Sequence, residues 1–152
     1  MPIDDATQTT VRELWAAGRA VGRAPAPVPE SDPWREAVQG APQGETVVSF
    51  PGTPEVEVRL HTDGRDTVLV ETTADFDVPR TDVVALVTEV LAERVRRRPR
   101  VRGFLGTMAS ALLGSPAPAD AEIRVGDRVY STPITAQQPL STWLMARPLT
   151  ED

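Results

Sequence analysis

The sequence predicts an α+β fold in which an antiparallel sheet packs against helices, in the order α-β-β-β-α-(α)-β-β-α. Three observations support this prediction. Two stretches alternate apolar and polar residues and fold back at a glycine-containing turn, which is typical of β-hairpins. Between them, apolar residues recur at helical spacing. A length of 152 residues usually corresponds to one domain with a hydrophobic core.

The prolines divide the chain into three parts. Four of them forbid regular structure after the first twenty residues: Pro25, Pro27, Pro29 and Pro33. We therefore expect an N-terminal helix within 1–22, a proline-rich arm or linker at 23–44 and an α+β core at 45–152, all in a single domain. Trp34 lies inside the arm and is expected to pin it to the core.

The first element is a short amphipathic helix over about 8–22. Its apolar residues recur on one side, at Val11, Leu14 and Trp15. Thr9 or Thr10 can cap the helix, and Glu13 follows Thr10 at the spacing of a capping box.

The first three strands are predicted from a run of two-residue periodicity. A short apolar strand at 46–50 ends at a Pro-Gly pair. Residues 55–61 alternate apolar and polar side chains, and 67–72 form the return strand. The Asp63-Gly64 pair between them favours a type I′ hairpin turn.

A second helix is predicted from about 81 to 98. Its apolar face comprises Val83, Val84, Leu86, Val87, Val90, Leu91 and Val95. Asp82 near its start and several arginines near its end suit the helix dipole, and Pro99 ends or kinks it. Residues 103–114 are expected to form a short helix or a packed loop.

A second hairpin and a terminal helix complete the predicted order. Residues 123–125 and 129–132 form the strands, joined by a type II′-style turn at Gly126-Asp127. Apolar residues at helical spacing predict a short helix within 137–145.

The sequence contains no pattern for catalysis, and we expect a protein that is not an enzyme and has no cofactor. It has no cysteine and one histidine, which excludes thiolate chemistry and multi-histidine metal sites. His61 falls on the polar face of a strand and is interpreted as solvated. Phosphate-loop, nucleophile-elbow and dinucleotide motifs are missing from the sequence.

Three aspartates resemble the start of a calcium-binding loop: Asp75, Asp77 and Asp82. Counted from Asp75, however, the fifth and sixth positions are Pro79 and Arg80, which cannot serve as an oxygen ligand and the loop glycine. We therefore interpret these acids as part of a turn and a helix cap, and we expect no metal site.

The net charge is −6 and is unevenly distributed. Residues 1–90 carry sixteen acids and seven arginines, a net charge of −9, whereas 91–102 carry one acid and six arginines, a net charge of +5. An acidic body with one basic cluster is not typical of a nucleic-acid-binding protein. All sixteen basic residues are arginine, which is typical of a GC-rich bacterial genome. No apolar stretch approaches the length of a membrane span, so we expect a cytoplasmic protein.

Seven residues are candidates for binding a partner: Trp15, Trp34, Arg97, Arg98, Phe104, Leu105 and Trp143. The tryptophans are either core plugs or anchors at a homodimer or partner interface, where tryptophan is enriched. The arginines, with the apolar pair after them, are either a solvated helix end or a contact with an acidic partner or anionic lipid.

The order of elements and the acidic charge over about 8–146 resemble the class I chaperones of type III secretion and the related YbjN-like domains. This resemblance implies an α/β sandwich that commonly dimerises and binds an extended segment of a client protein, such as a secreted effector or a modifying enzyme. The leading hypothesis is therefore a non-enzymatic protein- or peptide-binding domain that uses an open strand edge or an apolar patch.

Two alternatives remain open. An immunity-type or regulatory inhibitor of a basic toxin or nuclease would present one acidic face. A small-ligand-binding domain would contain a cavity of a few hundred cubic ångströms with converging polar groups.

Overall fold

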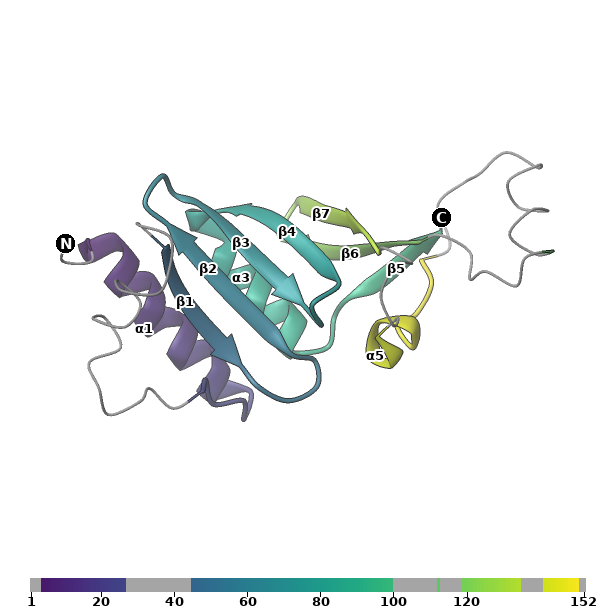
Figure 1. The fold of residues 1–152 in the computed structure, drawn as a ribbon, viewed down its shortest axis with the longest axis horizontal. Helices are drawn as coiled ribbons and strands as arrows, with labels where there is room; N and C mark the ends of the chain where they lie inside the picture. The colour runs from purple at the N-terminus through teal and green to yellow at the C-terminus, as the bar shows by residue number, and fades with distance from the viewer. Residues whose placement is uncertain (1–3, 27–44, 100–111, 113–118, 135–140, 151–152) are drawn as a thin grey trace.

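The computed structural model describes residues 4–26, 45–99, 112, 119–134 and 141–150, and it confirms the α+β class. The helices are α1 (Asp5–Ala20), α3 (Arg80–Leu91) and α5 (Thr142–Met145). A four-stranded antiparallel sheet comprises β1 (Glu45–Phe50), β2 (Val56–His61), β3 (Arg65–Val70) and β4 (Ala74–Pro79), in that order. A three-stranded antiparallel sheet comprises β5 (Arg96–Pro99), β6 (Ala119–Val125) and β7 (Arg128–Pro133), again in order (Figure 1).

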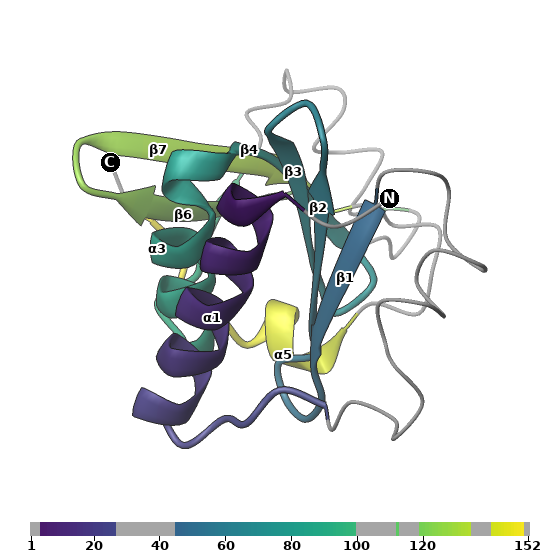
Figure 2. The same cartoon turned by 90° about the vertical axis from the view of Figure 1, so that its left-hand side faces the viewer.

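The two sheets and the helices share one hydrophobic core. Both α1 and α3 cover the same face of the four-stranded sheet, and the three-stranded sheet packs on another side of α3 (Figure 2). Because α3 has neighbours on several sides, its Val83, Leu86 and Val90 are all fully buried. Leu14 of α1 and Ile123 of β6 join the same core, so the smaller sheet is held to the larger one through α3.

The N-terminal helix is confirmed, but it begins earlier than predicted. Asp4 is its cap, and a side-chain oxygen of Asp4 accepts a hydrogen bond from the Thr7 amide at 2.8 Å. The hydroxyls of Thr9 and Thr10 instead donate to main-chain carbonyls four residues earlier, at 2.8 and 3.0 Å. These threonines therefore lie inside the helix, where their side chains cannot cap it.

The first hairpin is confirmed with a different turn. The loop between β2 and β3 has three residues, and within it only Gly64 has a positive φ, of 77°. A type I′ turn requires positive φ at both central residues, so Asp63 does not fit it. The side chain of Asp63 accepts a hydrogen bond from the Arg65 amide at 2.9 Å instead.

The prediction of a turn at Asp75 and Asp77 is wrong, because both residues belong to β4. Phe76 and Val78 alternate with them and are buried, at 2% and 1% exposure. The aspartates lie on the outer, exposed face of the four-stranded sheet. The sheet therefore has one strand more than the sequence predicts.

The predicted helix over 81–98 is also too long. The helix α3 ends in a Schellman motif in which Glu93, with φ of 60°, occupies the left-handed position that glycine usually takes. The amides of Glu93 and Arg94 donate to the carbonyls of Val90 and Glu89, each at 2.9 Å. The chain then turns and continues as β5, so Arg96, Arg97 and Arg98 of the predicted helix end lie on a strand, and Arg94 lies in the turn before it.

The second hairpin is confirmed, with the two-residue turn Gly126-Asp127 and a positive φ of 60° at Gly126 alone, as a type II′ turn requires. The terminal helix is confirmed only as the single turn α5. The predicted arm at 23–44 lies largely outside the described residues, and so does nearly all of 103–114.

A buried ion pair links the helices α1 and α3 to the hairpin formed by β2 and β3. The carboxylate of Asp66 on β3 is fully buried and accepts hydrogen bonds from the Arg80 guanidinium at 2.5 and 2.9 Å. The same guanidinium donates to the carbonyl of His61 at 2.6 Å and to the hydroxyl of Thr7 on α1 at 3.0 Å. Hydrogen bonding to Asp66 is the main reason that the pKa of Arg80 is raised.

A second polar cluster attaches β7 to the start of α3. The hydroxyl of Tyr130 donates a hydrogen bond to the carboxylate of Asp82, and Arg128 donates another at 3.0 Å. The bond from Tyr130 is the largest cause that lowers the pKa of Asp82 below 3.8, and the charge of Arg128 adds to it.

This cluster predicts a pH-dependent effect of Tyr130→Phe. A carboxyl with a lowered pKa in the folded state stabilises the protein above about pH 4, and this contribution is lost as the pH falls through the folded-state pKa. We expect Tyr130→Phe to be less stable than the wild type at about pH 7, with a difference that shrinks below about pH 4. Urea unfolding of both proteins at about pH 7 and at a pH below about 4 measures this difference in stability. A difference that stays constant with pH would contradict it.

Candidate functional site

The outer edge of β7 makes no strand pairing with any described residue. On its inner side, the amide of Ile134 donates to the carbonyl of Ala119 at 3.0 Å, which sets the pattern of the β6–β7 ladder. Because hydrogen-bonded pairs alternate along an antiparallel ladder, Val129 and Ser131 direct their main-chain N–H and C=O groups away from β6. The Val129 side chain is 47% exposed. An extended segment could therefore pair with β7 here.

Of the other three outer strands, β1 and β5 already have main-chain neighbours. Beside β1, the amide of Ala26 donates to the carbonyl of Ser49 at 2.8 Å. Beside β5, the amide of Arg97 donates to the carbonyl of Pro148 at 2.9 Å, and the amide of Thr150 donates back to Arg97 at 2.8 Å. The C-terminal residues thus lie along β5 as a short parallel bridge. This leaves β7 more accessible for strand pairing than β1 or β5. The fourth outer strand, β4, makes no main-chain bond to a described residue on its outer side, and it packs against β7.

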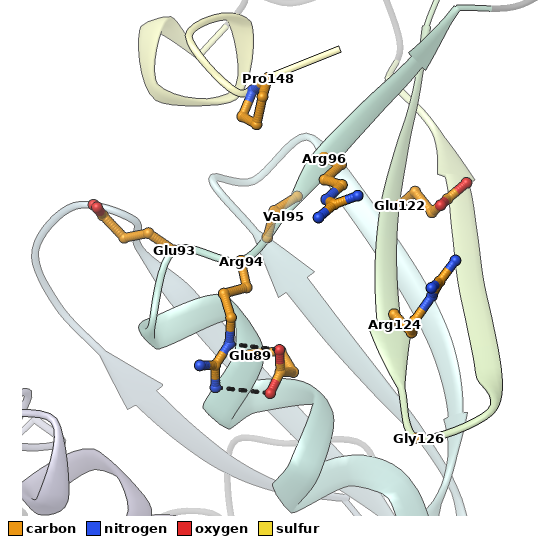
Figure 3. A pocket seen from close by; sticks show the side chains of 9 residues that line it. All are labelled: Glu89, Glu93, Arg94, Val95, Arg96, Glu122, Arg124, Gly126 and Pro148. Carbon is orange, nitrogen blue, oxygen red and sulfur yellow. Dashed lines mark hydrogen bonds and ion pairs between the residues drawn. The ribbon is translucent and has the colours of Figure 1, made fainter. Parts of the chain in front are cut away.

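A cavity of about 490 Å³ lies between the C-terminal end of α3 and the β5–β6 pair (Figure 3). It is lined by Glu89, Glu93, Arg94, Val95, Arg96, Glu122, Arg124, Gly126 and Pro148. Its volume falls within the range of about 300–1,000 Å³ that is usual for ligand sites. Six of its nine lining residues are charged and none is aromatic, so the cavity offers charged groups to a polar ligand.

The acidic residues of this cavity have cationic partners. The pairs are Glu89–Arg94 at 2.7 Å, Glu93–Arg147 at 4.0 Å and Glu122–Arg98 at 3.6 Å. Arg96 and Arg124 are exposed, and neither makes an ion pair with any residue that the structure describes. The lining itself contains three carboxylates and three arginines. Because two of these carboxylates pair with Arg147 and Arg98, which lie outside the lining, Arg96 and Arg124 remain without an ion pair to a described residue.

The structure places Trp143 in the core, as the core-plug alternative predicts. Its side chain is only 7% exposed, and its indole N–H donates to Glu93 at 3.3 Å. The Arg147 guanidinium lies over the ring, 4.3 Å from the centroid. Trp15 is half-buried against the core, with Arg19 at 5.5 Å from its ring centroid.

The structure brings Arg97 and Arg98 to opposite faces of β5. Arg97 is half-buried, and its side chain donates to the carbonyl of Arg147 at 2.9 Å, so it holds the C-terminal residues in place. Arg98 is 56% exposed and pairs with Glu122. The remaining candidates, Trp34, Phe104 and Leu105, lie outside the described residues.

Sequence reasoning missed Arg96 and Arg124 as a pair. Arg96 belongs to the basic cluster that the sequence makes visible, but Arg124 lies in a separate hairpin with no excess of positive charge. Only the pairing of β5 with β6 brings the two together. His61, the single histidine, contributes its main-chain amide to Asp66, at 2.8 Å.

Within the described ranges, no group of three or more potential ligand residues could hold a metal ion. No helix of the described part of the chain has the length and apolar character needed to cross a bilayer. No family model, curated protein or solved structure matches the chain, so the resemblance to class I secretion chaperones and YbjN-like domains stays a prediction.

Proposed function

We propose that this protein is a non-enzymatic binding domain that takes up an extended segment of another protein along β7. The outward main-chain groups of Val129 and Ser131 are the observation that carries the proposal. Two strand residues with free N–H and C=O groups offer up to four main-chain hydrogen bonds to an added strand. The exposed Val129 side chain offers an apolar contact for the partner.

The partner in this proposal is a client polypeptide in the cytoplasm, such as a secreted effector or a modifying enzyme. Natural proteins usually block a free strand edge with prolines, charges or a covering loop. On β7, Pro133 and the exposed Arg128 flank the open pair on either side. These flanking residues limit pairing to a short segment of the client.

Replacing Ser131 by proline tests this proposal. Proline removes the outward N–H, and its ring obstructs an added strand, while the main-chain bonds to β6 come from neighbouring residues. We expect Ser131→Pro to weaken binding of a co-purified client about tenfold or more. The matched control Ser131→Ala keeps the N–H and should bind like the wild type.

The measurement is co-purification from native cells at about 50 and 200 mM salt, followed by size-exclusion light scattering. A stoichiometric client that survives the higher salt, and that Ser131→Pro alone loses, would support the proposal. A client retained by folded Ser131→Pro, or no client at all, would refute it. A homodimer that Ser131→Pro dissociates would make a second copy the partner and would contradict a separate client.

The charges on the outer face of the four-stranded sheet bear on the inhibitor alternative. Asp75 and Asp77 are exposed there, which favours an acidic binding face. On the same face, however, Arg59 bridges Glu57 at 2.7 Å and Glu45 at 3.5 Å. This mixture of signs weakens attraction to a basic toxin or nuclease, so the inhibitor is the less supported function.

A further inference from the structure

The cavity beside β5 is formed where two strands separate. β5 and β6 pair only as far as Arg96 opposite Glu122. The next β6 residue on that side is Arg124. The chain opposite it belongs to the Schellman motif at the end of α3 and has not yet entered β5, so it does not pair with β6 there. In the β6–β7 ladder, the alternate residues Ile123 and Val125 bond to β7, so Arg124 directs its main-chain N–H into this opening.

Two guanidinium groups reach the same opening. Arg96 enters from the start of β5 and Arg124 from β6, and both line the cavity (Figure 3). The three acids of the wall each form an ion pair with a different arginine, and neither Arg96 nor Arg124 makes an ion pair with a described residue. Two like charges that share a cavity repel each other, and a ligand with two negative charges would relieve this repulsion.

From this arrangement we propose that the cavity is a binding site for a small, polar, doubly charged oxyanion. The planar guanidinium fork donates two parallel hydrogen bonds to a carboxylate or phosphate, which makes arginine well suited to such groups. The Arg124 amide supplies a further donor. A phosphate group and a dicarboxylate share this chemistry.

This site is separate from the edge of β7, because it lies on the opposite side of β6. The proposal therefore does not depend on client binding. Ser131→Pro is expected to leave oxyanion binding unchanged, so failure of either proposal can be recognised without the other.

Titration of the purified full chain with inorganic phosphate at about pH 8, where a phosphate group carries two charges, tests the proposal. Calorimetry measures the affinity, and the Arg124 amide resonance reports the location. We expect saturable binding to one site and a shift of that resonance. Acetate, a monoanion, should bind about tenfold more weakly. Succinate, a dicarboxylate, is titrated in parallel, and the tighter of the two dianions identifies the ligand class.

Single variants assign the binding to the two arginines. Arg96→Gln and Arg124→Gln should each weaken phosphate or succinate binding about tenfold, because each removes a charge-assisted contact. Arg12→Gln removes the same charge from the exposed face of α1 and should change the affinity by less than about twofold. Binding that does not saturate, or that the three variants weaken equally, would overturn the proposal. Wild-type affinity in both cavity variants would also overturn it.

Discussion

Replacing Asp66 by alanine is expected to destabilise the fold by about 3–5 kcal/mol, the usual cost of removing one partner of a buried ion pair. The Asp66 carboxylate is fully buried, whereas the Arg80 side chain keeps 18% of its surface exposed. Because water can still reach part of the guanidinium, the loss should fall near the lower end of that range. The variant also leaves the amide of His61 without the acceptor that Asp66 provides at 2.8 Å.

Urea unfolding measures this loss, and two further variants keep the test informative. Asp77→Ala removes an exposed aspartate from the neighbouring strand, opposite Thr67, and should change the free energy of unfolding by no more than about 0.5 kcal/mol. Asp66→Asn keeps an acceptor but loses the charge, so its stability should lie between those of the wild type and Asp66→Ala. An Asp66→Ala protein as stable as Asp77→Ala would show that the pair does not hold the helices to the hairpin.

Trp143→Ala is expected to destabilise the protein by about 3–5 kcal/mol, as truncation of a buried aromatic residue usually does. The ring lies in the core beneath Arg147, and its indole N–H bonds to Glu93. Loss of the ring should also loosen the chain that follows α5. The Thr150 amide, which donates to Arg97 at 2.8 Å, should then lose protection from hydrogen exchange.

Trp15→Ala is the matched comparison, because Trp15 is only half-buried on α1 and should cost less than Trp143→Ala. Thermal unfolding and hydrogen exchange of the two variants distinguish a core plug from a binding anchor. If Trp143→Ala kept wild-type stability but lost a co-purified partner, the anchor interpretation would be correct. A stability loss at Trp143 with normal exchange at Thr150 would separate the core role from the docking of the C-terminal residues.

Local patterns in the sequence determined much of this fold. The alternation over 55–61 predicted β2, and the glycines at the two turns predicted the two hairpins. Both kinds of signal are read from neighbouring residues. The apolar spacing from Val83 to Leu91 likewise predicted α3. These features depend on contacts within a few residues, so they could be identified without a tertiary structure.

The features that the sequence did not reveal depend on distant partners. β5 has the sequence Arg-Arg-Arg-Pro, with no apolar alternation, and it is a strand because β6 pairs with one side of it while Pro148 and Thr150 bond to the other. The end of α3 was hidden because Glu93, rather than a glycine, takes the left-handed position.

The candidate sites show the same division. The basic cluster was visible in the sequence, but the presence of Arg96 and Arg124 in one cavity was not. Their proximity depends on the pairing of β5 with β6. The open edge of β7 likewise exists only relative to the strands around it. Sequence alone determined the local elements and their charges. Tertiary structure decided which charges are paired and which strand edges are left open, because the packing of distant segments sets both.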